Sequence, residues 1–513
     1  MIENPILRGF CPDPSIIRVE DDFYIATSTF EWWPGVKIHH SKDLKNWQQI
    51  ASPLQRLSQL NMIGNPTSGG IWAPCLSYHE GRFYLIYTDV KTKKGRYYNN
   101  HNYLVYTDDI NGEWSDPIYL NSTGFDPSLF HDKDGKKYLV NMKNGFKGIL
   151  VQEYDGVKNC LVGEVRNIFT GTEAGYTEGP HIYNINGYYY LIVAEGGTGY
   201  GHCVTMARSK SIFGPYEIDP ENPMLTSRDD ENDYLQKSGH ADIVSTKDNE
   251  WYMVHLCARP IKDEQICVLG RETAIQKVYW NEDGWLRLST NQKKVERFVE
   301  GPNIAEHPFP PPIEKDDFNS EVLGIRYSSP RIPLGENADL TARKGYLRLT
   351  GQESMNSHHH VSLVATKQSS IDAQAELSID FNPLYEEQLA GLTYMYDTLN
   401  FYVLGKTVDQ NEENILVLLK SDQGVITDMI SPTPIEANKT IYMRVTTKDK
   451  FAQFSYSYDK EKWINLGGKC DNTILSDEHC RGFTGAHFGM YCHDMTGLRL
   501  YADFDYFSYK DLD

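Results

Sequence analysis

Short hydrophobic stretches alternate with polar residues along the whole chain, and turn signals separate them. Five stretches in the first half are rich in aromatic residues: Phe23-Tyr24-Ile25, Phe83-Tyr84-Leu85, Lys137-Tyr138-Leu139, Tyr189-Tyr190-Leu191 and Trp251-Tyr252-Met253. Turn pairs such as Asp134-Gly135 and Asn186-Gly187 stand just before them and are typical of β-hairpins. The pattern predicts short antiparallel strands over residues 1–300 and no long amphipathic helix there.

A related motif lies about ten residues before each aromatic stretch. The five copies are Pro12-Asp13-Pro14-Ser15, Ile71-Trp72-Ala73-Pro74, Phe125-Asp126-Pro127-Ser128, Thr177-Glu178-Gly179-Pro180 and Gly239-His240-Ala241-Asp242. Their leading residues are 59, 54, 52 and 62 positions apart. A repeat of roughly 40–60 residues built from short strands is typical of a β-propeller blade. We therefore predict a five-bladed propeller in which the five leading side chains point into one central funnel.

The second half of the chain has the same alternation without the repeat. A proline-rich stretch, His307-Pro308-Phe309-Pro310-Pro311-Pro312, predicts an extended linker. The all-β chain is thus expected to hold a propeller at residues 1–300, a linker at 301–315 and a jelly-roll or concanavalin-like β-sandwich at 316–513. A hairpin at Trp280–Trp285 is expected to close the propeller.

Composition excludes several classes of partner. The formal net charge is −20, with the acidic residues spread along the chain, so we expect no binding to nucleic acid or to an anionic membrane surface. A run of about 18 apolar residues, which a membrane-spanning helix needs, is absent. The nine cysteines include no C-x-x-C pair, and the N-terminal residues do not resemble a signal peptide; both predict a cytoplasmic protein with reduced thiols.

Three of the five leading residues are carboxylic acids. Pro14 predicts an extended backbone at Asp13, and Asp126 repeats the same Asp-Pro-Ser unit. Glu178 stands among small residues that leave its carboxyl free to reach a cavity. Each acid alone is more often a turn or loop residue, but their shared position in the repeat favours a common site. Three carboxylates, an imidazole and an indole in one pocket indicate cleavage of a glycosidic bond.

Other candidates have two interpretations each. Trp72 and Phe30 could stack on a sugar ring or belong to the propeller core. His240 could orient a carboxylate, bind a substrate hydroxyl or ligate a cation, and a lone histidine is more often structural. Arg271 could clamp a sugar hydroxyl, keep Asp126 ionised or form a salt bridge at the rim.

Two motifs are set aside. Gly197-Thr198-Gly199-Tyr200-Gly201 superficially suggests a phosphate loop, but no helical pattern follows it. His358-His359-His360 places two imidazoles on one face of a strand, which without further ligands is weak evidence for a metal site.

Taken together, the motifs resemble those of glycoside hydrolase family 43, closely its two-domain β-xylosidases, over essentially the whole chain. The resemblance rests on the following segments: Cys11-Pro12-Asp13-Pro14-Ser15, Thr27-Ser28-Thr29-Phe30-Glu31-Trp32, Ile38-His39-His40-Ser41-Lys42-Asp43-Leu44, Gly69-Gly70-Ile71-Trp72-Ala73-Pro74, Gly124-Phe125-Asp126-Pro127-Ser128, Thr177-Glu178-Gly179-Pro180, Ala194-Glu195-Gly196-Gly197-Thr198 and Gly270-Arg271-Glu272-Thr273-Ala274.

The resemblance implies an inverting hydrolase with Asp13 as general base, Glu178 as general acid and Asp126 as the residue that tunes and orients the acid. It also implies a set of pocket residues around a bound pentose: Phe30, Trp72, Thr198, His240 and Arg271. A loop from the sandwich is expected to cover the pocket and to contribute His487 and Phe488.

The chain departs from the family pattern in two places. The segment after Met142 lacks the longer loop with a tryptophan near the leaving-group subsite, and it reads Lys143-Asn144-Gly145-Phe146. The covering loop has its aromatic residue one position later than expected after Ala486. Both departures fall on the pocket entrance.

The sequence therefore predicts an exo-acting enzyme that releases xylose from short β-1,4-xylo-oligosaccharides. Inversion requires the Asp13 and Glu178 carboxyls to be about 6.5–9.5 Å apart. An α-L-arabinofuranosidase, or an enzyme with both activities, is the alternative, and a sugar-binding propeller without activity is a third. No cofactor is required by this chemistry; a Ca²⁺ ion near His240 and a homo-oligomer stay open.

Overall fold

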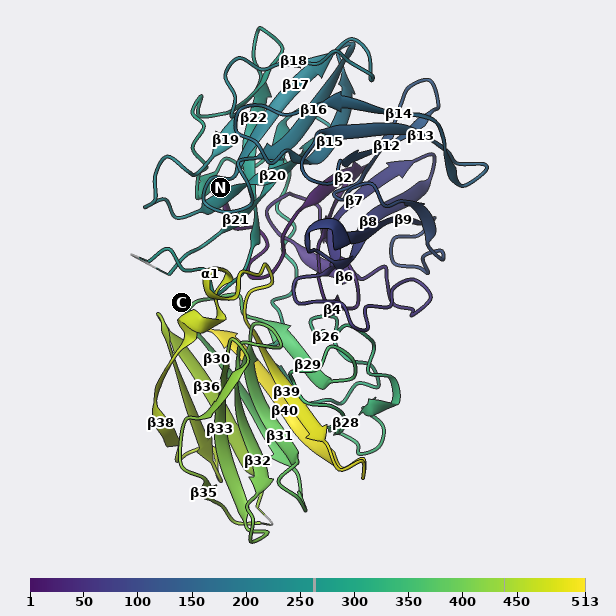
Figure 1. Ribbon diagram of the computed structural model, residues 1–513. Coiled ribbons are helices and arrows are strands. Elements are labelled where there is room, and N and C mark those ends of the chain that lie inside the picture. The colour runs from purple at the N-terminus through teal and green to yellow at the C-terminus, as the bar shows by residue number, and fades with distance from the viewer. Residues whose placement is uncertain (262–263, 438, 513) are drawn as a thin grey trace.

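The computed structural model describes residues 1–261, 264–437 and 439–512, which form two β-rich domains (Figure 1). The propeller, purple to teal, lies above the sandwich, green to yellow, and the C-terminus lies near the junction. The predicted all-β class with a five-bladed propeller and a β-sandwich is confirmed. In the described residues, no helix has both the length and the apolar character needed to cross a membrane.

Each blade is one antiparallel sheet whose innermost strand begins at one of the five motifs. From the axis outward, the blades are β2 (Ser15–Val19), β3 (Asp22–Thr27), β5 (Lys37–Ser41) and β6 (Gln48–Ala51); β7 (Gly70–His79), β8 (Arg82–Thr92), β9 (Asn99–Thr107) and β10 (Ile118–Asn121); β11 (Ser128–His131), β12 (Lys137–Met142), β13 (Ile149–Asp155) and β14 (Cys160–Phe169); β15 (Glu178–Ile185), β16 (Tyr188–Glu195), β17 (Cys203–Ser209) and β18 (Glu217–Ile218), with β19 (Leu225–Thr226) also on β17; and β20 (Gln236–Ser245), β21 (Trp251–Ala258), β22 (Glu272–Trp280) and β23 (Leu286–Leu288).

Both faces of the inner strands are covered by neighbouring blades, which is why these strands read as hydrophobic runs and not as strict alternations. Every residue of β20 from Gln236 to Val244 is buried. Between the first two blades, Trp33, Tyr87 and Trp114 pack in one core. This packing fixes the five strand starts relative to one another.

The ring is closed by the N-terminal segment. Strand β1 (Ile2–Glu3) pairs with β24 (Phe298–Val299), and the Asn4 side chain donates to the carbonyl oxygens of Ile275 and Glu296. The hairpin expected at Trp280–Trp285 is present as the link between β22 and β23, and the first and last blades also meet directly where the Ser15 hydroxyl donates to Asp242.

The proline-rich connection contacts the propeller. The Glu306 carboxylate pairs with Lys45, and the His307 amide donates to the Asp43 carboxylate at 2.7 Å. The connection contains no helix or strand between β24 and β25 (Lys315–Asp316), all of whose residues the structure describes. It therefore lies along the propeller surface before the sandwich begins.

Two sheets form the sandwich. The first contains β27 (Ala338–Asp339), β28 (Leu347–Thr350), β40 (Tyr501–Asp511), β30 (Ala373–Asp380), β36 (Ile441–Lys448), β37 (Phe451–Ser457) and β38 (Ile464–Asp471), with β25 on β40. The second contains β29 (Ser362–Lys367), β39 (His487–Asp494), β31 (Gln388–Met395), β32 (Phe401–Val408), β33 (Asn414–Asp422) and β34 (Val425–Asp428), with β35 (Thr433–Pro434) on β33. Aromatic and aliphatic side chains such as Tyr394, Phe454 and Phe504 fill the space between the sheets.

The two domains are joined by strand pairing and by contacts of a short helical segment of the sandwich with the propeller. Strand β26 (Ser329–Pro330) pairs with β4 (Trp32–Trp33) of the propeller, and the Arg331 amide donates to the Glu31 carbonyl oxygen at 2.7 Å. The short helices η3 (Asn472–Leu475) and α1 (Asp477–Cys480) lie at the junction in Figure 1. Two further single turns are η1 (Gly95–Tyr97) and η2 (Gly335–Asn337).

Candidate active site

The five inner strands share an irregularity at the position of the motif. The backbone is left-handed at Asp13 (φ 53°), Asp126 (φ 51°) and His240 (φ 48°), and one residue later in the other two blades, at Ala73 (φ 29°) and Gly179 (φ 58°). Aspartate tolerates this conformation better than most residues. The expectation that Pro14 holds Asp13 extended is therefore wrong.

Four side chains meet at the axis and define what we call the floor: Asp13, Asp126, Glu178 and His240. The four residues are between 6% and 9% exposed. Asp13 accepts a hydrogen bond from the Ser28 hydroxyl at 2.6 Å, and its other oxygen lies 3.9 Å from His240 Nδ1. The His240 ring packs on Gly179, where an added Cβ would lie 3.0 Å from it. The structure thus brings together the acids that the repeat predicted.

Burial and mutual repulsion keep protons on the floor. Burial and the Asp13 charge raise the pKa of Glu178 to about 8, although Arg271 opposes the shift. Burial, with the charges of Glu178 and Asp13, also raises the pKa of Asp126, whose carboxylate accepts from the Gly179 amide at 3.1 Å. Burial lowers the pKa of His240, although Asp13 opposes this, so its imidazole is neutral near pH 7. The floor can therefore hold one protonated acid beside an ionised one.

Four aromatic side chains surround the floor and form what we call the aromatic wall: Phe30, Trp72, Phe125 and Phe483. Trp72 meets Phe125 edge-on with ring centroids 5.2 Å apart, and its indole N–H donates to the Ser68 carbonyl oxygen. Phe30 lies 5.5 Å from Phe483 and 6.1 Å from Trp72. The wall offers ring faces and edges to the apolar C–H groups of a sugar.

Arg271 connects the wall to a polar group on the fourth blade. Its guanidinium donates to the Thr198 hydroxyl and lies 4.2 Å from the centre of the Phe483 ring. Asp477 from helix α1 lies 4.0 Å from Arg271 Nε and 3.4 Å from Lys237 Nζ. The predicted pocket residues Thr198 and Arg271 are thus in contact. The Asp477 carboxylate of the sandwich lies beside the same arginine.

The prediction for the covering loop is wrong in its residues. Phe488 lies in the sandwich core, stacked on Tyr394 at 4.5 Å. His487 stacks on Trp32 at 4.1 Å behind the pocket. Successive residues of β39 point to opposite faces of its sheet, so neither extends into the pocket. The sandwich contributes Phe483 instead, an aromatic residue just before the Thr484-Gly485 turn that could have been considered from the sequence.

Sequence reasoning also missed two residues next to the acids. Tyr98 stacks over Phe125, and burial together with the charges of Asp126 and Glu178 raises its pKa. Glu195 has no exposed surface and accepts hydrogen bonds from Thr172, from Thr205 and, at 2.7 Å, from the Thr177 hydroxyl. It fixes the residue that precedes Glu178. Glu195 stood within one of the motif segments, but nothing in its spacing indicated this role.

Phe146 lies at the pocket entrance, where the expected tryptophan is missing. Its ring meets Phe125 at 5.9 Å and Tyr176 at 5.2 Å, both edge-on. Tyr176 is 60% exposed. The short loop therefore still places an aromatic ring beside the wall, in contact with solvent.

A small chamber below the floor is lined by Asp13, Cys75, Asp126, His181 and His240, and its volume of about 10 Å³ is near the minimum for one water molecule. Asp242 crosslinks three blades there, accepting from the Ser15 hydroxyl at 3.0 Å and from Tyr183, with His181 at 3.8 Å. The axis therefore narrows to about the size of one water molecule beneath the carboxylates.

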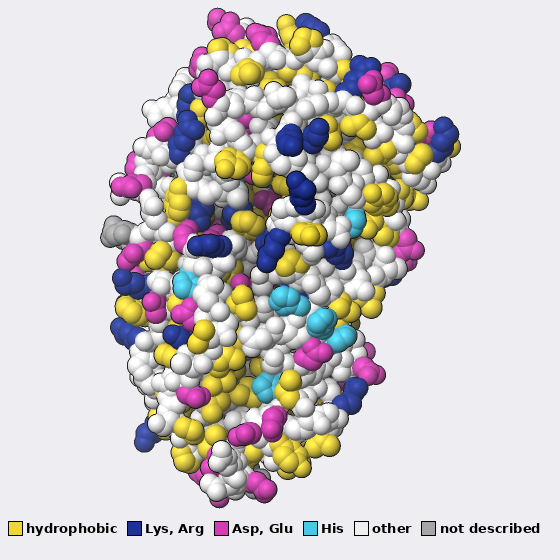
Figure 2. All heavy atoms as spheres, viewed as in Figure 1, with side chains coloured by type: hydrophobic (Ala, Val, Ile, Leu, Met, Phe, Trp, Pro, Cys, Tyr) yellow, Lys and Arg dark blue, Asp and Glu magenta, His cyan; other side chains and the backbone are white. Residues whose placement is uncertain are grey.

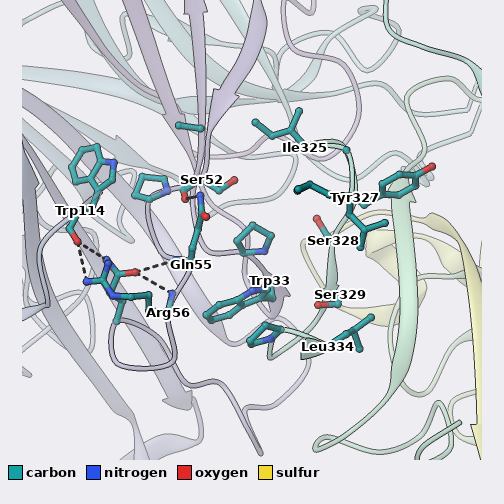
Figure 3. Close-up of a pocket in the computed structure, with 18 of the residues that line it drawn as sticks. Trp33, Ser52, Gln55, Arg56, Trp114, Ile325, Tyr327, Ser328, Ser329 and Leu334 are labelled. Atoms are coloured by element: carbon teal, nitrogen blue, oxygen red, sulfur yellow. Dashed lines mark hydrogen bonds between the residues drawn. The ribbon is translucent and has the colours of Figure 1, made fainter. Parts of the chain in front are cut away.

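A larger groove of about 780 Å³ between the first two blades and the sandwich is a different kind of cavity (Figure 3). Trp33, Gln55 and Arg56 from the propeller face Ile325 and Tyr327 from the sandwich across it. No floor residue lines this groove. Its size alone does not make it the reaction centre, because it lacks the convergent acids.

In the part of the chain that the structure describes, the charges on the surface and the glycine-rich and histidine motifs give no sign of a second site. Figure 2 shows Lys and Arg side chains over the middle of this face of the propeller and acidic ones mostly toward its edge. A strand, β17, follows Gly197–Gly201, and His358 contacts the Thr398 hydroxyl at 3.1 Å. Among the described residues, no three His, Cys, Asp or Glu side chains are grouped to hold a metal ion.

Comparison with known families gives two matches. Residues 2–286 match the family model described as Glycosyl hydrolases family 43. Residues 315–510 match the one described as beta xylosidase C-terminal concanavalin A-like domain, in agreement with the expected type of sandwich.

Three similar proteins extend over the whole chain. A beta-xylosidase of Bacillus subtilis is 47% identical and a xylosidase/arabinosidase 43B of Humicola insolens is 45% identical, with 99% of this chain covered in both and 99% and 97% of theirs. The crystal structure of a xylan beta-1,4-xylosidase from Bacillus halodurans superposes with a TM-score of 0.98 at 49% identity, with all of both chains covered.

Proposed function

The chain belongs to glycosyl hydrolase family 43, and from this premise we propose that it is an inverting exo-β-xylosidase acting on short β-1,4-xylo-oligosaccharides. The observation that carries the proposal is the meeting of three buried carboxyls at the closed end of a pocket with aromatic sides. That the enzyme is a glycoside hydrolase acting on a saccharide follows from the family itself.

Glu178 is the general acid in this mechanism. Its raised pKa of about 8 keeps the carboxyl protonated near neutral pH, so it can donate the proton to the glycosidic oxygen as the bond to the anomeric carbon breaks. Asp126 lies beside it and, through the Gly179 amide, contacts the turn that carries Glu178. This contact orients the acid.

Asp13 is the general base. The Ser28 hydroxyl donates to one Asp13 oxygen, and this hydrogen bond orients the carboxylate while leaving the other oxygen free. That oxygen takes a proton from a water molecule, whose hydroxyl adds to the anomeric carbon from the side opposite the leaving group. After each cycle Asp13 holds a proton and Glu178 lacks one, and exchange with solvent restores both.

The narrow axis explains exo-cleavage. The chamber below the floor has room for about one water molecule and none for a sugar. A chain can therefore enter only with its terminal pentose first. Arg271 and Thr198 lie where they can bind its hydroxyls, and the aromatic wall packs against its ring.

An α-L-arabinofuranosidase activity on the same site is the second candidate. It is favoured by the similarity to the xylosidase/arabinosidase of Humicola insolens and by the entrance, where Phe146 takes the place of a larger ring. Rates on the two aryl glycosides measure the ratio of these activities.

The first experiment is proton NMR with xylotetraose and fresh enzyme. Early α-xylose together with xylotriose is expected, because a β-linkage cleaved with inversion gives the α-anomer. Early β-xylose would contradict inversion, and no cleavage of xylotetraose would contradict the xylosidase proposal. Cleavage of an arabinofuranoside in that last case would support the second candidate.

We propose further that no metal is required, because the acid and the base are both side chains of the floor. A calcium ion near His240 would depend mostly on water ligands, since among the residues that the structure describes His240 pairs with a single carboxylate, that of Asp13. Unchanged activity after chelation is expected.

The nine free cysteines support a cytoplasmic location, and the charge of −20 argues against nucleic acid as a partner. A homo-oligomer can be checked by light scattering.

A further inference from the structure

A cluster of basic groups and one thiol lies buried between the two domains, directly behind the floor. Cys11 precedes Asp13 by two residues and has no exposed surface. Lys367, the last residue of β29 in the sandwich, places its Nζ 2.7 Å from Cys11 Sγ. The cluster is completed by His39, whose Nε2 lies 3.9 Å from the same sulfur, and by Lys37.

The cluster holds two amines and a thiol close together in a buried space. In the described part of the chain, neither Lys37 nor Lys367 forms an ion pair with a carboxylate. Burial and repulsion from Lys367 lower the pKa of Lys37 to about 8, and Cys11 opposes the shift. Lys37 therefore loses its proton at mildly alkaline pH, within the same buried space as the thiol.

The distance between Lys367 Nζ and Cys11 Sγ limits the kinds of bond that can join them. Sulfur is larger than oxygen, so an N–H···S hydrogen bond is expected to be longer than the usual range of about 2.7–3.2 Å for N–H···O. The 2.7 Å between Lys367 Nζ and Cys11 Sγ is short for such a bond and too long for a direct sulfur–nitrogen bond. It is the spacing of two atoms joined through one small atom.

Both backbones are held in place. The Cys11 amide donates to the Arg271 carbonyl oxygen at 2.8 Å, and the Cys11 carbonyl accepts from Thr273. Lys367 is paired with His487 in the register of β29 and β39. A direct sulfur–nitrogen bond would need the domains to move closer, whereas a single bridging oxygen would not.

We infer that Cys11 and Lys367 form an oxidative crosslink in which one oxygen atom joins the cysteine sulfur to the lysine nitrogen. Hydrogen peroxide is the oxidant. One peroxide converts the thiol to a sulfenic acid and water. A second accepts two electrons as the amine nitrogen bonds to the sulfenic oxygen, and two further waters leave. In total, the S–H bond and one N–H bond break, S–O and O–N bonds form, and sulfur and nitrogen each lose two electrons to the two peroxides.

The crosslink joins the sandwich to the segment that carries Asp13. Because the atoms are already at bridging distance, the floor keeps its geometry and xylosidase turnover is retained. The covalent link constrains the unfolded chain between residues 11 and 367, so the oxidised protein is expected to unfold at a temperature several degrees higher. Cys11 is buried and Lys367 is half-buried, which limits the oxidant to a molecule close to water in size.

Peptide mass spectrometry of peroxide-treated full-length protein tests the crosslink. The expected product joins the peptides that contain Cys11 and Lys367, with a mass about 14 Da above their sum, and a thiol reductant releases it. A mass about 2 Da below the sum would indicate a direct sulfur–nitrogen bond and overturn the oxygen bridge. Recovery of Cys11 only as a free thiol or a sulfinic acid would overturn the crosslink altogether.

Three variants serve as controls. Cys11→Ser and Lys367→Arg should both abolish the joined peptide, and Lys367→Arg keeps the positive charge, so its xylosidase activity reports whether it folds. Cys160→Ser removes an exposed cysteine remote from the cluster and should leave the joined peptide and its effect on the unfolding temperature unchanged. Peroxide-dependent stabilisation that persists in Lys367→Arg would assign the effect to another site.

Discussion

The floor of the pocket comes from equivalent positions of repeated strands, whereas the aromatic wall combines two residues of the repeated motifs with Phe30 and Phe483, which lie outside them, and draws on both domains. Asp13, Asp126 and His240 are aimed at the axis by one left-handed residue at the start of each strand. Phe483 reaches the same pocket from the sandwich through contacts with Phe30 and Arg271. Backbone geometry thus places the reacting groups, and packing across the domain junction places the groups that select the sugar.

This difference predicts different kinetic effects. A change in the floor should reduce kcat, because the acid and the base act in the transition state. A change in the wall should act mainly on KM and on the choice of substrate. Substitutions in the two regions test this division.

Replacing either Glu178 or Asp13 by alanine should reduce kcat about 10²–10⁴-fold, the usual contribution of acid–base catalysis. The two losses should depend differently on the leaving group. An aryl xyloside with an acidic phenol needs little protonation, so Glu178→Ala should recover much of its rate on that substrate and Asp13→Ala should not. Equal losses on all leaving groups would contradict the assignment of Glu178 as the acid.

Glu178→Gln measures how the buried acid affects the stability of the fold, independently of its role in catalysis. The folded-state pKa of about 8 lies above the value of 4.5 in an unfolded chain. Below about pH 4.5 both states are protonated, and as pH rises toward 8 the unfolded state alone gains from ionisation, so Glu178 increasingly destabilises the fold. The inactive glutamine variant should therefore have a higher Tm than the wild type at pH 7 and the same Tm at pH 4. A lower Tm at pH 7 would contradict burial of a protonated acid.

Arg271→Gln tests whether a residue in contact with the wall changes the pKa of Glu178 on the floor. In the wild type, kcat/KM should fall as pH rises through about 8, because Glu178 loses its proton. Arg271 lowers that pKa, so its removal should move the alkaline limb to higher pH in addition to raising KM. Lys237→Gln is the matched control, since it removes a neighbouring buried cation that does not shift the pKa of Glu178; its alkaline limb should stay in place.

Phe483→Ala should reduce kcat/KM about 3- to 10-fold, mostly through KM, as expected for the loss of one aromatic contact. Phe483→Tyr, which keeps the ring, should restore most of it. Steady-state kinetics on xylobiose give both values. A loss confined to kcat would mean that the sandwich acts on the reacting groups and would break the comparison between floor and wall.

Phe146→Ala should have the smallest effect, about 2- to 3-fold, because the ring lies at the solvent-exposed entrance. The change should be visible with xylotriose and absent with an aryl xyloside that does not extend past the entrance. Equal changes on both substrates would place Phe146 inside the pocket.

The two regions also differ in how far sequence could predict them. The repeat located every floor residue, because equivalent positions in a propeller must share one axis. It erred on the backbone at Asp13, where a left-handed conformation aims the carboxyl toward Ser28 and His240. The general preference for an extended backbone before a proline does not take these contacts of Asp13 into account.

The wall was predicted only in part. Trp72 follows the repeat, Phe30 was expected from the family resemblance, and the two rings lie near each other. Phe488 was wrong because a shift of one residue along a strand moves a side chain to the other face, and nothing local decides which aromatic of the segment leaves the sheet. Phe483 depends on Arg271, more than 200 residues away, and a contact of that kind leaves no periodic signal.

The N-terminal closure of the ring has a consequence for the order in which the protein is made. The backbone partners of Ile2, Glu3, Asn4, Leu7 and Cys11 lie between Arg271 and Val299, so these pairings wait while almost the whole propeller leaves the ribosome. At about 5–20 residues per second that delay is on the order of 15–60 s. Protease should cut a stalled nascent chain ahead of Asp13 until residue 299 has emerged. Within the propeller, residues 2–11 are thus made before the other blades and protected after them, and the segment that carries the base depends on them.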